Sequence, residues 1–327
     1  MLIFQIIWWW SNNKFFELNS FSPIDTKFIS DKYQLSTFDS NVTFTSRTIQ
    51  RYKQLIKTHL GINEYNNDIE SKLQQYAIEL AANYNCRLLV FNVFENLSNV
   101  ETDIGYDELV NQYKHQKQNE LKLRFEKLIT NRSVMCDVIS YEKHETIAST
   151  IAKFAFKNYI DLVIAGTHGA SGFKNNSFGS NTLALIQETN NPLIIVPNNA
   201  IYKTFQKIAF AFKGMDYEIG LIQIVLGLLN ISIQNLELIH VTSDDDVMDL
   251  SRYEKLIQEC LKDNSIQISY INDHNIANGL NNFTIQNKID LLILTGTPKS
   301  FFLKLFSPNI VSRLSYQVNI PLLYLPI

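Results

Sequence analysis

Cysteine is scarce in this chain of 327 residues, which holds three, Cys86, Cys136 and Cys260. They make no Cys-x2-Cys pair and follow no His-spaced zinc pattern, so neither a disulfide framework nor a structural zinc site is expected. Long apolar runs are also lacking, because no segment reaches 18 uninterrupted apolar residues, the length typical of a membrane-spanning helix. These absences favour a protein without a membrane role, in the reducing environment of the cytoplasm.

A surplus of charge of either sign is missing as well. The 29 Lys and Arg residues against 32 Asp and Glu residues give a formal net charge of −3. This balance provides no broad basic field for a phosphate backbone, so nucleic-acid binding is not expected. Apolar residues make up 46% of the chain and charged residues 19%, which argues against wholesale disorder. At roughly 150 residues per domain, the length predicts about two domains.

The first ten residues, Met1–Trp10, are apolar (MLIFQIIWWW). They lack a basic region and a small-residue cleavage site, and they are about half as long as a membrane span. A buried or edge strand is the main expectation for them, with a peripheral membrane or partner contact and a mis-assigned start as the alternatives. Residues 1–60 as a whole carry little periodic signal and are expected to form an N-terminal extension, to which the sequence assigns no role.

From about residue 68, apolar segments with the period of a helix alternate with short apolar runs typical of buried strands. The strands are expected at 87–94, 134–140, 161–165, 192–197, 208–212, 236–241, 266–271, 290–294 and 321–326, with helices between them. Such alternation predicts an α/β fold with parallel sheets. We expect two tandem, doubly wound, Rossmann-like domains at residues 61–198 and 203–327, each with a mostly parallel sheet of five strands.

An internal repeat supports the division into two domains. Asp161 and Asp290 begin the similar segments DLVIA and DLLIL and lie 129 residues apart. Pro192 and Pro321, which begin PLIIVP and PLLYLP, are separated by the same 129 residues. The offset holds without a gap over both segments, and this period is far too long for a solenoid. Two copies of one α/β domain explain the repeat.

A loop rich in glycine follows the strand expected at 161–165. Its spacing, Gly-x2-Gly-x9-Gly-Ser, is formed by Gly166, Gly169, Gly179 and Ser180. Glycine lets the backbone approach a ligand closely, and the free N–H groups at the start of the next helix favour an anion. The loop leaves the carboxyl end of a parallel strand, where open α/β sheets bind ligands. These features predict a cradle for the phosphates and ribose of a nucleotide; a turn that needs glycine for its shape alone is the alternative.

The motif in this strand–loop–helix setting resembles that of the universal stress protein family in its ATP-binding form. It is neither the Walker loop nor the Rossmann GxGxxG pattern. The resemblance covers roughly residues 61–198 and again 205–327, and tandem chains are common in that family. It implies an adenine-nucleotide-binding-like fold, with ATP as the ligand and magnesium left open as its companion.

The resemblance also implies roles for individual residues. Gly166 and Gly169 would contact ribose and phosphate, and Gly179, Ser180 and Asn181 would hold the phosphates. Ala165 and Val93, at the ends of two strands, would flank the adenine. The family's first strand usually ends in an acidic residue; here the matching stretch is expected at His59–Tyr65 (HLGINEY), with Glu64 the nearest match.

Other residues in or near the loop have simpler interpretations. His168 is expected to pack in the loop or lie near the phosphates, with proton transfer as a weaker alternative. Lys174 could pair with a phosphate, but a solvated lysine is the simpler expectation. Asp244, Asp245 and Asp246 are adjacent and point in different directions, so a solvated loop or helix start is favoured over a metal site. No catalytic residue is assigned, and metal ligands stay undetermined.

The second copy has lost the motif. Adding 129 to the four motif positions gives Thr295, Pro298, Pro308 and Asn309. The two prolines lack the N–H groups that phosphates would need, so this copy is not expected to bind ATP in the same way. The segment 300–306 (SFFLKLF) is expected to be apolar packing or a partner surface.

The family's last strands pair across a twofold axis, so Leu193–Val196 and Leu322–Leu325 are expected to meet antiparallel in an intrachain pseudo-dimer, which would cover two apolar edges. Further assembly of copies stays open. The leading function is a regulatory stress protein that binds ATP in its first domain, while the second domain is structural or docks an unknown protein partner. The alternatives are an interaction protein without nucleotide and, third, a slow ATP phosphohydrolase, for which no base, nucleophile or phosphate-loop lysine is evident.

Overall fold

The computed structural model describes residues 2–5, 67–95, 106–130, 132–143, 145–167, 180–242, 250–262, 266, 268–296 and 320–327. Strands and helices alternate along the chain, which confirms the predicted α/β class. The first half of the described chain contains β1 (Leu2–Gln5), α3 (Asn67–Asn83), β2 (Leu88–Glu95), α4 (Tyr106–Ile129), β3 (Cys136–Lys143), α5 (Ile147–Lys157), β4 (Leu162–Gly166), α6 (Ser180–Glu188) and β5 (Leu193–Val196). The second half contains β6 (Ile208–Ala211), α7 (Asp216–Leu228), a 3-10 turn (Ile233–Asn235), β7 (Leu236–Thr242), α8 (Ser251–Leu261), β8 (Ile268–Asn272), α9 (Ile276–Gln286), β9 (Leu291–Gly296) and β10 (Leu322–Pro326).

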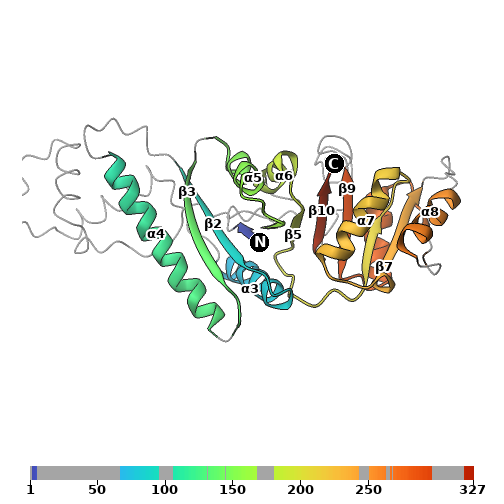
Figure 1. Ribbon diagram of the computed structural model, residues 1–327, viewed down its shortest axis with the longest axis horizontal. Coiled ribbons are helices and arrows are strands. Elements are labelled where there is room, and N and C mark those ends of the chain that lie inside the picture. The colour runs from blue at the N-terminus through green and yellow to red at the C-terminus, as the bar shows by residue number, and fades with distance from the viewer. Residues whose placement is uncertain are drawn as a thin grey trace, which may run out of the picture. The chain divides into compact units, whose positions relative to one another are not determined.

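The strands form one ten-stranded sheet with the order β3-β2-β1-β4-β5-β10-β9-β6-β7-β8 (Figure 1). Strands pair in parallel within each half. At the junction, β5 and β10 pair antiparallel, with Leu323 opposite Ile194 and Tyr324 opposite Leu193. The two last strands therefore meet in the orientation expected from the sequence, and the five strands of one half continue directly into those of the other.

Strand β1 confirms that the apolar segment Met1–Trp10 contains a strand, and it corrects the interpretation of residues 1–60 as an extension outside the domain. Leu2–Gln5 pairs in parallel with β2 on one side and with β4 on the other. The first strand of the sheet is therefore Leu2–Gln5, and the domain boundary drawn at residue 61 excluded it wrongly. The stretch His59–Tyr65, expected to supply this strand, lies outside the described residues. Leu2, Ile3 and Phe4 are well suited to a central strand, whereas Gly61 and Asn63 would weaken one.

Both faces of the sheet are covered. Helices α5 and α6 pack on each other, and a continuous apolar core lies on their side of the sheet. This core includes Phe91 in the first half, Ile195 and Tyr324 at the junction, and Leu292 in the second half, all fully buried. Alternate strand residues point to the opposite face, where α3 contacts β1, β2 and β4. A sheet covered on both faces explains why its strands are almost uninterrupted apolar runs.

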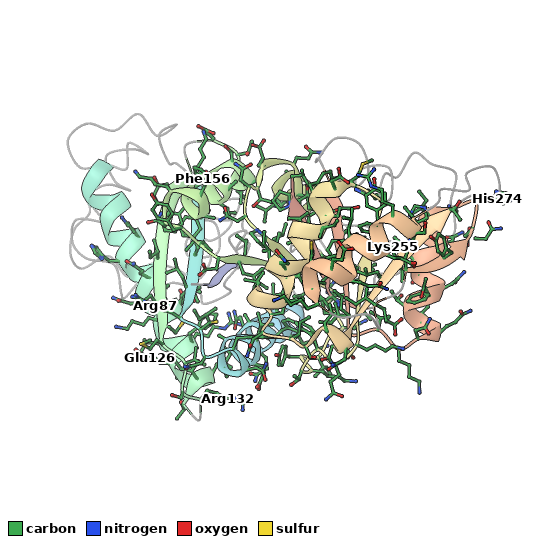
Figure 2. The ribbon with its side chains drawn as sticks, turned by 45° about the vertical axis from the view of Figure 1, so that its right-hand side comes forward. Arg87, Glu126, Arg132, Phe156, Lys255 and His274 are labelled. Atoms are coloured by element: carbon green, nitrogen blue, oxygen red, sulfur yellow. The ribbon has the colours of Figure 1, made fainter. Side chains whose placement is uncertain are left out.

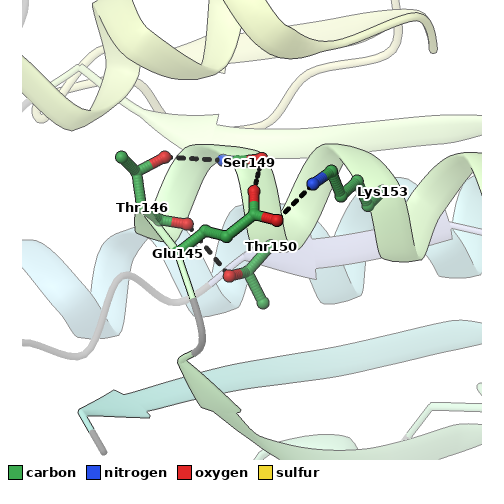
Figure 3. A network of polar contacts seen from close by, with 5 residues as sticks. All are labelled: Glu145, Thr146, Ser149, Thr150 and Lys153. Carbon is green, nitrogen blue, oxygen red and sulfur yellow. Dashed lines mark hydrogen bonds and ion pairs between the residues drawn. The ribbon is translucent and has the colours of Figure 1, made fainter.

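The first turn of α5 is fixed by side-chain hydrogen bonds (Figure 3). The Thr146 hydroxyl, at the N-cap, accepts from the backbone N–H of Ser149 at 3.0 Å, which satisfies one of the helix's free donors. Ser149 Oγ donates to Glu145 Oε2 at 2.6 Å, and Lys153 pairs with the other carboxylate oxygen. The negative Glu145 beside a helix N-terminus is also favoured by the helix dipole. These contacts set where α5 begins against the sheet.

The 129-residue offset extends to the helices before β4 and β9. Thr146 caps the start of α5 and Asn275 caps the start of α9, at matching positions of the two halves. At the helix ends, Tyr159 and Lys288 both adopt a positive φ, of 51° and 55°. The same offset thus relates helix starts, helix ends and the strands that follow them.

Two glycines in helices of the second half offer a matched test of packing. A Cβ on Gly279 in α9 would lie 3.0 Å from Val241 Cγ1 and 3.1 Å from Asp273 Cβ, whereas one on Gly220 in α7 would meet nothing within 4 Å. Gly279→Ala is therefore expected to lower the free energy of unfolding by about 1 kcal/mol. Gly220→Ala is expected to raise it by about 0.5–1 kcal/mol, because alanine favours a helix. Urea unfolding followed by circular dichroism measures both, and effects of equal sign would contradict this packing.

Candidate functional site

The carboxyl ends of β1 to β5 lie at one edge of the sheet, because these strands are parallel. We call this the first carboxyl edge. Strand β1 lies between β2, the next strand along the chain, and β4. The strand order thus reverses at β1, and crevices at such switch points are where open α/β sheets bind ligands. The residue that ends β1 at this edge is Gln5.

Strand β4 and helix α6 are tied together at this edge. Gly166 is the last residue of β4, and Ser180 is the first residue of α6. The Thr182 hydroxyl donates a hydrogen bond to the Gly166 carbonyl at 2.8 Å, and the Thr182 side chain is fully buried. The first turn of α6 contains no acidic residue, so nothing in that turn opposes an anion at the helix N-terminus.

The residue after β4 is held on its other side. The backbone N–H of Thr167 donates to the Val196 carbonyl at 3.0 Å. The Thr167 hydroxyl donates to Asn198 Oδ1 at 3.3 Å, and Thr167 is 4% exposed. The glycine-bearing segment therefore leaves the sheet from a fixed and buried position.

The structure brings part of the predicted site together. Gly166, Ser180 and Asn181 lie at the first carboxyl edge, where β4 ends and α6 begins. Ala165 and Val93 are in β4 and β2, with β1 between these strands, and both side chains are buried in the core under α5 and α6. The other predicted residues lie outside the described part of the chain: His168, Gly169, Lys174, Gly179, Asp244–Asp246, the segment 300–306 and Glu64.

Sequence reasoning missed three contributions to this edge. The predicted first strand at His59–Tyr65 leaves out Gln5, which ends β1. Thr182 lies two residues after the Gly-Ser pair, but its partner Gly166 is 16 residues away in sequence. Asn198 ends the first predicted domain and belongs to no motif, although its side chain accepts a hydrogen bond from Thr167. A threonine in the first turn of the motif's helix was the one local signal available.

The second half has a different arrangement at its own carboxyl edge. Glu218 in α7 is fully buried, and its carboxylate accepts from the backbone N–H groups of Lys213 at 2.9 Å and Met215 at 3.1 Å. Its other oxygen accepts from the Thr295 hydroxyl at 2.7 Å. Glu218 thereby joins the end of β6 to the end of β9, which are neighbouring strands.

Lys213 completes this polar cluster. Its ammonium group donates to the backbone carbonyl of Thr295. Burial lowers the pKa of Lys213, and the negative charge of Glu218 opposes that shift. The Tyr324 hydroxyl donates to the carbonyl of Gly296, the last residue of β9, at 2.8 Å. Side chains of the second half thus satisfy backbone groups at the switch point between β6 and β9.

Among the described residues, no group of three or more His, Cys, Asp or Glu side chains is placed to hold a metal ion. Cys86, Cys136 and Cys260, all within the described ranges, are free thiols. Burial raises the pKa of Cys136 to about 12, so this thiol stays protonated at neutral pH.

Two arginines on the surface form ion pairs between elements of the first half. Arg87, before β2, forms an ion pair with Asp137 in β3 at 2.5 Å, and Arg132 pairs with Glu79 in α3. Figure 2 labels the two arginines. The hydrogen bond to Asp137 raises the pKa of Arg87. Both arginines are at the amino-terminal ends of their strands, away from the first carboxyl edge. No helix in the described ranges is long and apolar enough to cross a membrane.

Comparison with protein families gives a match in the first half. Residues 66–197 match the model of the universal stress protein family. A search of curated proteins finds no significant match to the chain.

Among solved structures, the chain is similar to a universal stress protein from Archaeoglobus fulgidus DSM 4304. The TM-score is 0.54 at 14% identity, over 79% of this chain and 92% of that one. A functionally unknown protein from Pseudomonas aeruginosa PAO1 matches with a TM-score of 0.42 at 10% identity, over 88% and 90% of the two chains. A member of the universal stress protein family from Burkholderia pseudomallei matches with 0.32 at 20% identity, over 41% and 90%. The first of these similarities shows the fold.

Proposed function

We propose that this protein is a tandem universal stress protein that acts in regulation, with ATP bound at the first carboxyl edge. The observation that carries the proposal is the juxtaposition of β4 and α6 there. Gly166 ends the strand, Ser180 opens the helix, and the Thr182–Gly166 hydrogen bond fixes the two against each other. The family match to residues 66–197 covers these elements.

The residues at this edge fit a nucleotide's phosphates. The N-terminus of a helix of nine residues offers free N–H groups and a favourable dipole, without an acidic side chain in its first turn. The sequence motif places Ser180 at the start of this helix, and the glycine at position 166 has no side chain that would keep a ligand from the backbone. In this proposal the protein binds ATP without hydrolysing it, and whether the site is occupied is what regulates the protein's action.

Titration calorimetry with ATP tests the proposal on the full chain. Wild-type protein is expected to bind a single nucleotide, and Gly179→Val to weaken binding by at least about tenfold, because the valine side chain obstructs approach to the helix N-terminus. Gly220→Ala is the matched control: it enlarges a glycine where a Cβ meets nothing within 4 Å, and it should leave the affinity unchanged. Absence of heat at millimolar ATP would remove the proposal, as would a Gly179→Val protein that binds ATP as tightly as the wild type.

We further propose that the second half is a structural or partner-binding module. Glu218, Lys213 and Thr295 satisfy one another and the backbone at the edge that would correspond to the first site. A buried carboxylate at that position would repel the phosphates of a nucleotide. A stoichiometry of one nucleotide per full-length chain supports this assignment, and two would contradict it.

A further inference from the structure

The Thr182–Gly166 hydrogen bond satisfies a backbone carbonyl at the end of β4. Within a parallel strand, neighbouring residues direct their N–H and C=O groups to opposite sides. The N–H of Thr167 points to β5, where it bonds Val196, so the Gly166 carbonyl points toward β1. The pairing of β1 with β4 ends at Phe4 and Ile164. The Thr182 hydroxyl therefore bonds a carbonyl that lies two residues beyond the last pair between the described residues of β1 and β4.

The two threonines at the start of α5 bond their own helix. Thr146 accepts from the N–H of Ser149, and the Thr150 hydroxyl donates to the Thr146 carbonyl four residues back. Thr182 instead donates across 16 residues to the preceding strand. Its side chain is fully buried, so it is not available to contact a ligand. The hydrogen bond connects the two ends of the glycine-bearing segment and thereby fixes the position of the α6 N-terminus relative to the end of β4.

We propose that Thr182 is a positioning residue for the nucleotide site at the first carboxyl edge. This inference rests on the proposed function. Thr182 touches no phosphate; it holds the first-turn N–H groups of α6 at the place where phosphates would receive them. Binding of phosphates by backbone N–H groups depends on where these groups lie. Loss of the Thr182–Gly166 hydrogen bond therefore weakens nucleotide binding, although Thr182 does not contact the nucleotide.

The test compares Thr182→Val with Thr182→Ser in titrations of the full chain with ATP. Valine keeps the shape of threonine and removes the donor, so the dissociation constant is expected to rise about tenfold. Serine keeps the donor and removes a methyl group, so it should restore the affinity to within about threefold of wild type. Rescue by serine separates positioning by the hydroxyl from a general packing defect.

Thr189 provides the matched control. It follows the C-terminal end of α6, is 2% exposed, and its hydroxyl bonds the backbone of Asn191, donating to the carbonyl and accepting from the N–H, each at 3.1 Å. Thr189→Val therefore removes the same kind of buried hydroxyl from the far end of the same helix. It should lower the melting temperature about as much as Thr182→Val and leave the affinity for ATP unchanged.

The outcomes separate the two proposals. If wild type binds ATP and Gly179→Val does not, but Thr182→Val binds like wild type, Thr182 has no positioning role and the proposed function stands. Equal losses of ATP affinity in Thr182→Val and Thr189→Val would also overturn the inference, since loosening of α6 would explain both. If wild type binds no nucleotide, the proposed function and this inference both fail. Should Thr182→Val not fold, Thr182→Ala also lacks the donor and replaces it in the titration. Below its melting temperature, its dissociation constant for ATP is expected to rise about tenfold as well.

Discussion

Glu218→Ala is expected to lower the free energy of unfolding by about 3–5 kcal/mol, the range typical of removing one partner from a buried charged cluster. The substitution leaves the backbone N–H groups of Lys213 and Met215 and the Thr295 hydroxyl without their shared acceptor. Each buried donor left in this way has its own cost. Lys213 would also lose the carboxylate that offsets the desolvation of its positive charge. Chemical unfolding monitored by circular dichroism measures the change.

Glu237→Ala is the control for that result. Glu237 pairs with Lys207 at 2.9 Å, and both side chains are about one-third exposed or more. Ion pairs of this kind contribute little, so the free energy of unfolding should change by less than about 1 kcal/mol. Glu218→Gln, which keeps the shape and one acceptor oxygen, should fall between the two. A loss at Glu218 no larger than that at Glu237 would show that the buried cluster does not hold β6 and β9 together.

Leu323→Asp is expected to have the largest effect, more than about 5 kcal/mol, which is comparable to the whole stability of many domains. Leu323 is fully buried in β10, with Ile194 of β5 on one side and Ile293 of β9 on the other. The change removes apolar packing and places a carboxylate at the strand that joins the two halves. The expected result is a protein recovered mainly in the insoluble fraction, or unfolded by circular dichroism.

Leu123→Asp makes the same exchange on the surface. Leu123 lies on α4 and is 60% exposed, so the substitution should shift the melting temperature by only a few degrees. The pair separates the effect of burial from that of aspartate itself. A soluble Leu323→Asp protein with the melting curve of Leu123→Asp would contradict the central position of β10 in the sheet.

Most elements of the fold could be predicted from sequence because their signals are local. The helix expected from residue 68 is α3, and the apolar runs expected as strands at 208–212 and 236–241 are β6 and β7, with ends that differ by at most one residue. Amphipathic period and uninterrupted apolar runs depend on neighbours in sequence, so they can be read without the fold. The helix expected between the last two strands lies outside the described residues.

The prediction of the first strand at His59–Tyr65 was wrong, because which segment forms this strand depends on partners that are distant in sequence. Residues 2–5 pair with Leu88–Phe91 and with Leu162–Ile164, more than 80 residues away along the chain. A short apolar run contains no information on which sheet it joins.

Some residues of the candidate site could be predicted from local sequence, and others depend on distant partners. Gly166 and Ser180 belong to a spacing motif that is visible in sequence, and the structure places both at the first carboxyl edge. The links that Thr182 and Glu218 make to strand ends could not be found, because Gly166 and Thr295 lie 16 and 77 residues away from them. An isolated threonine or glutamate in a first helical turn is ordinary, and its role is set by the strand that folds against it.

The antiparallel contact of β5 with β10 has a consequence for how this protein could work with others. Because each half is parallel within itself, the reversal at that contact directs the strand ends of the two halves to opposite margins of the one sheet. A molecule held at one margin would not obstruct a molecule at the other, because the length of the strands separates the two margins.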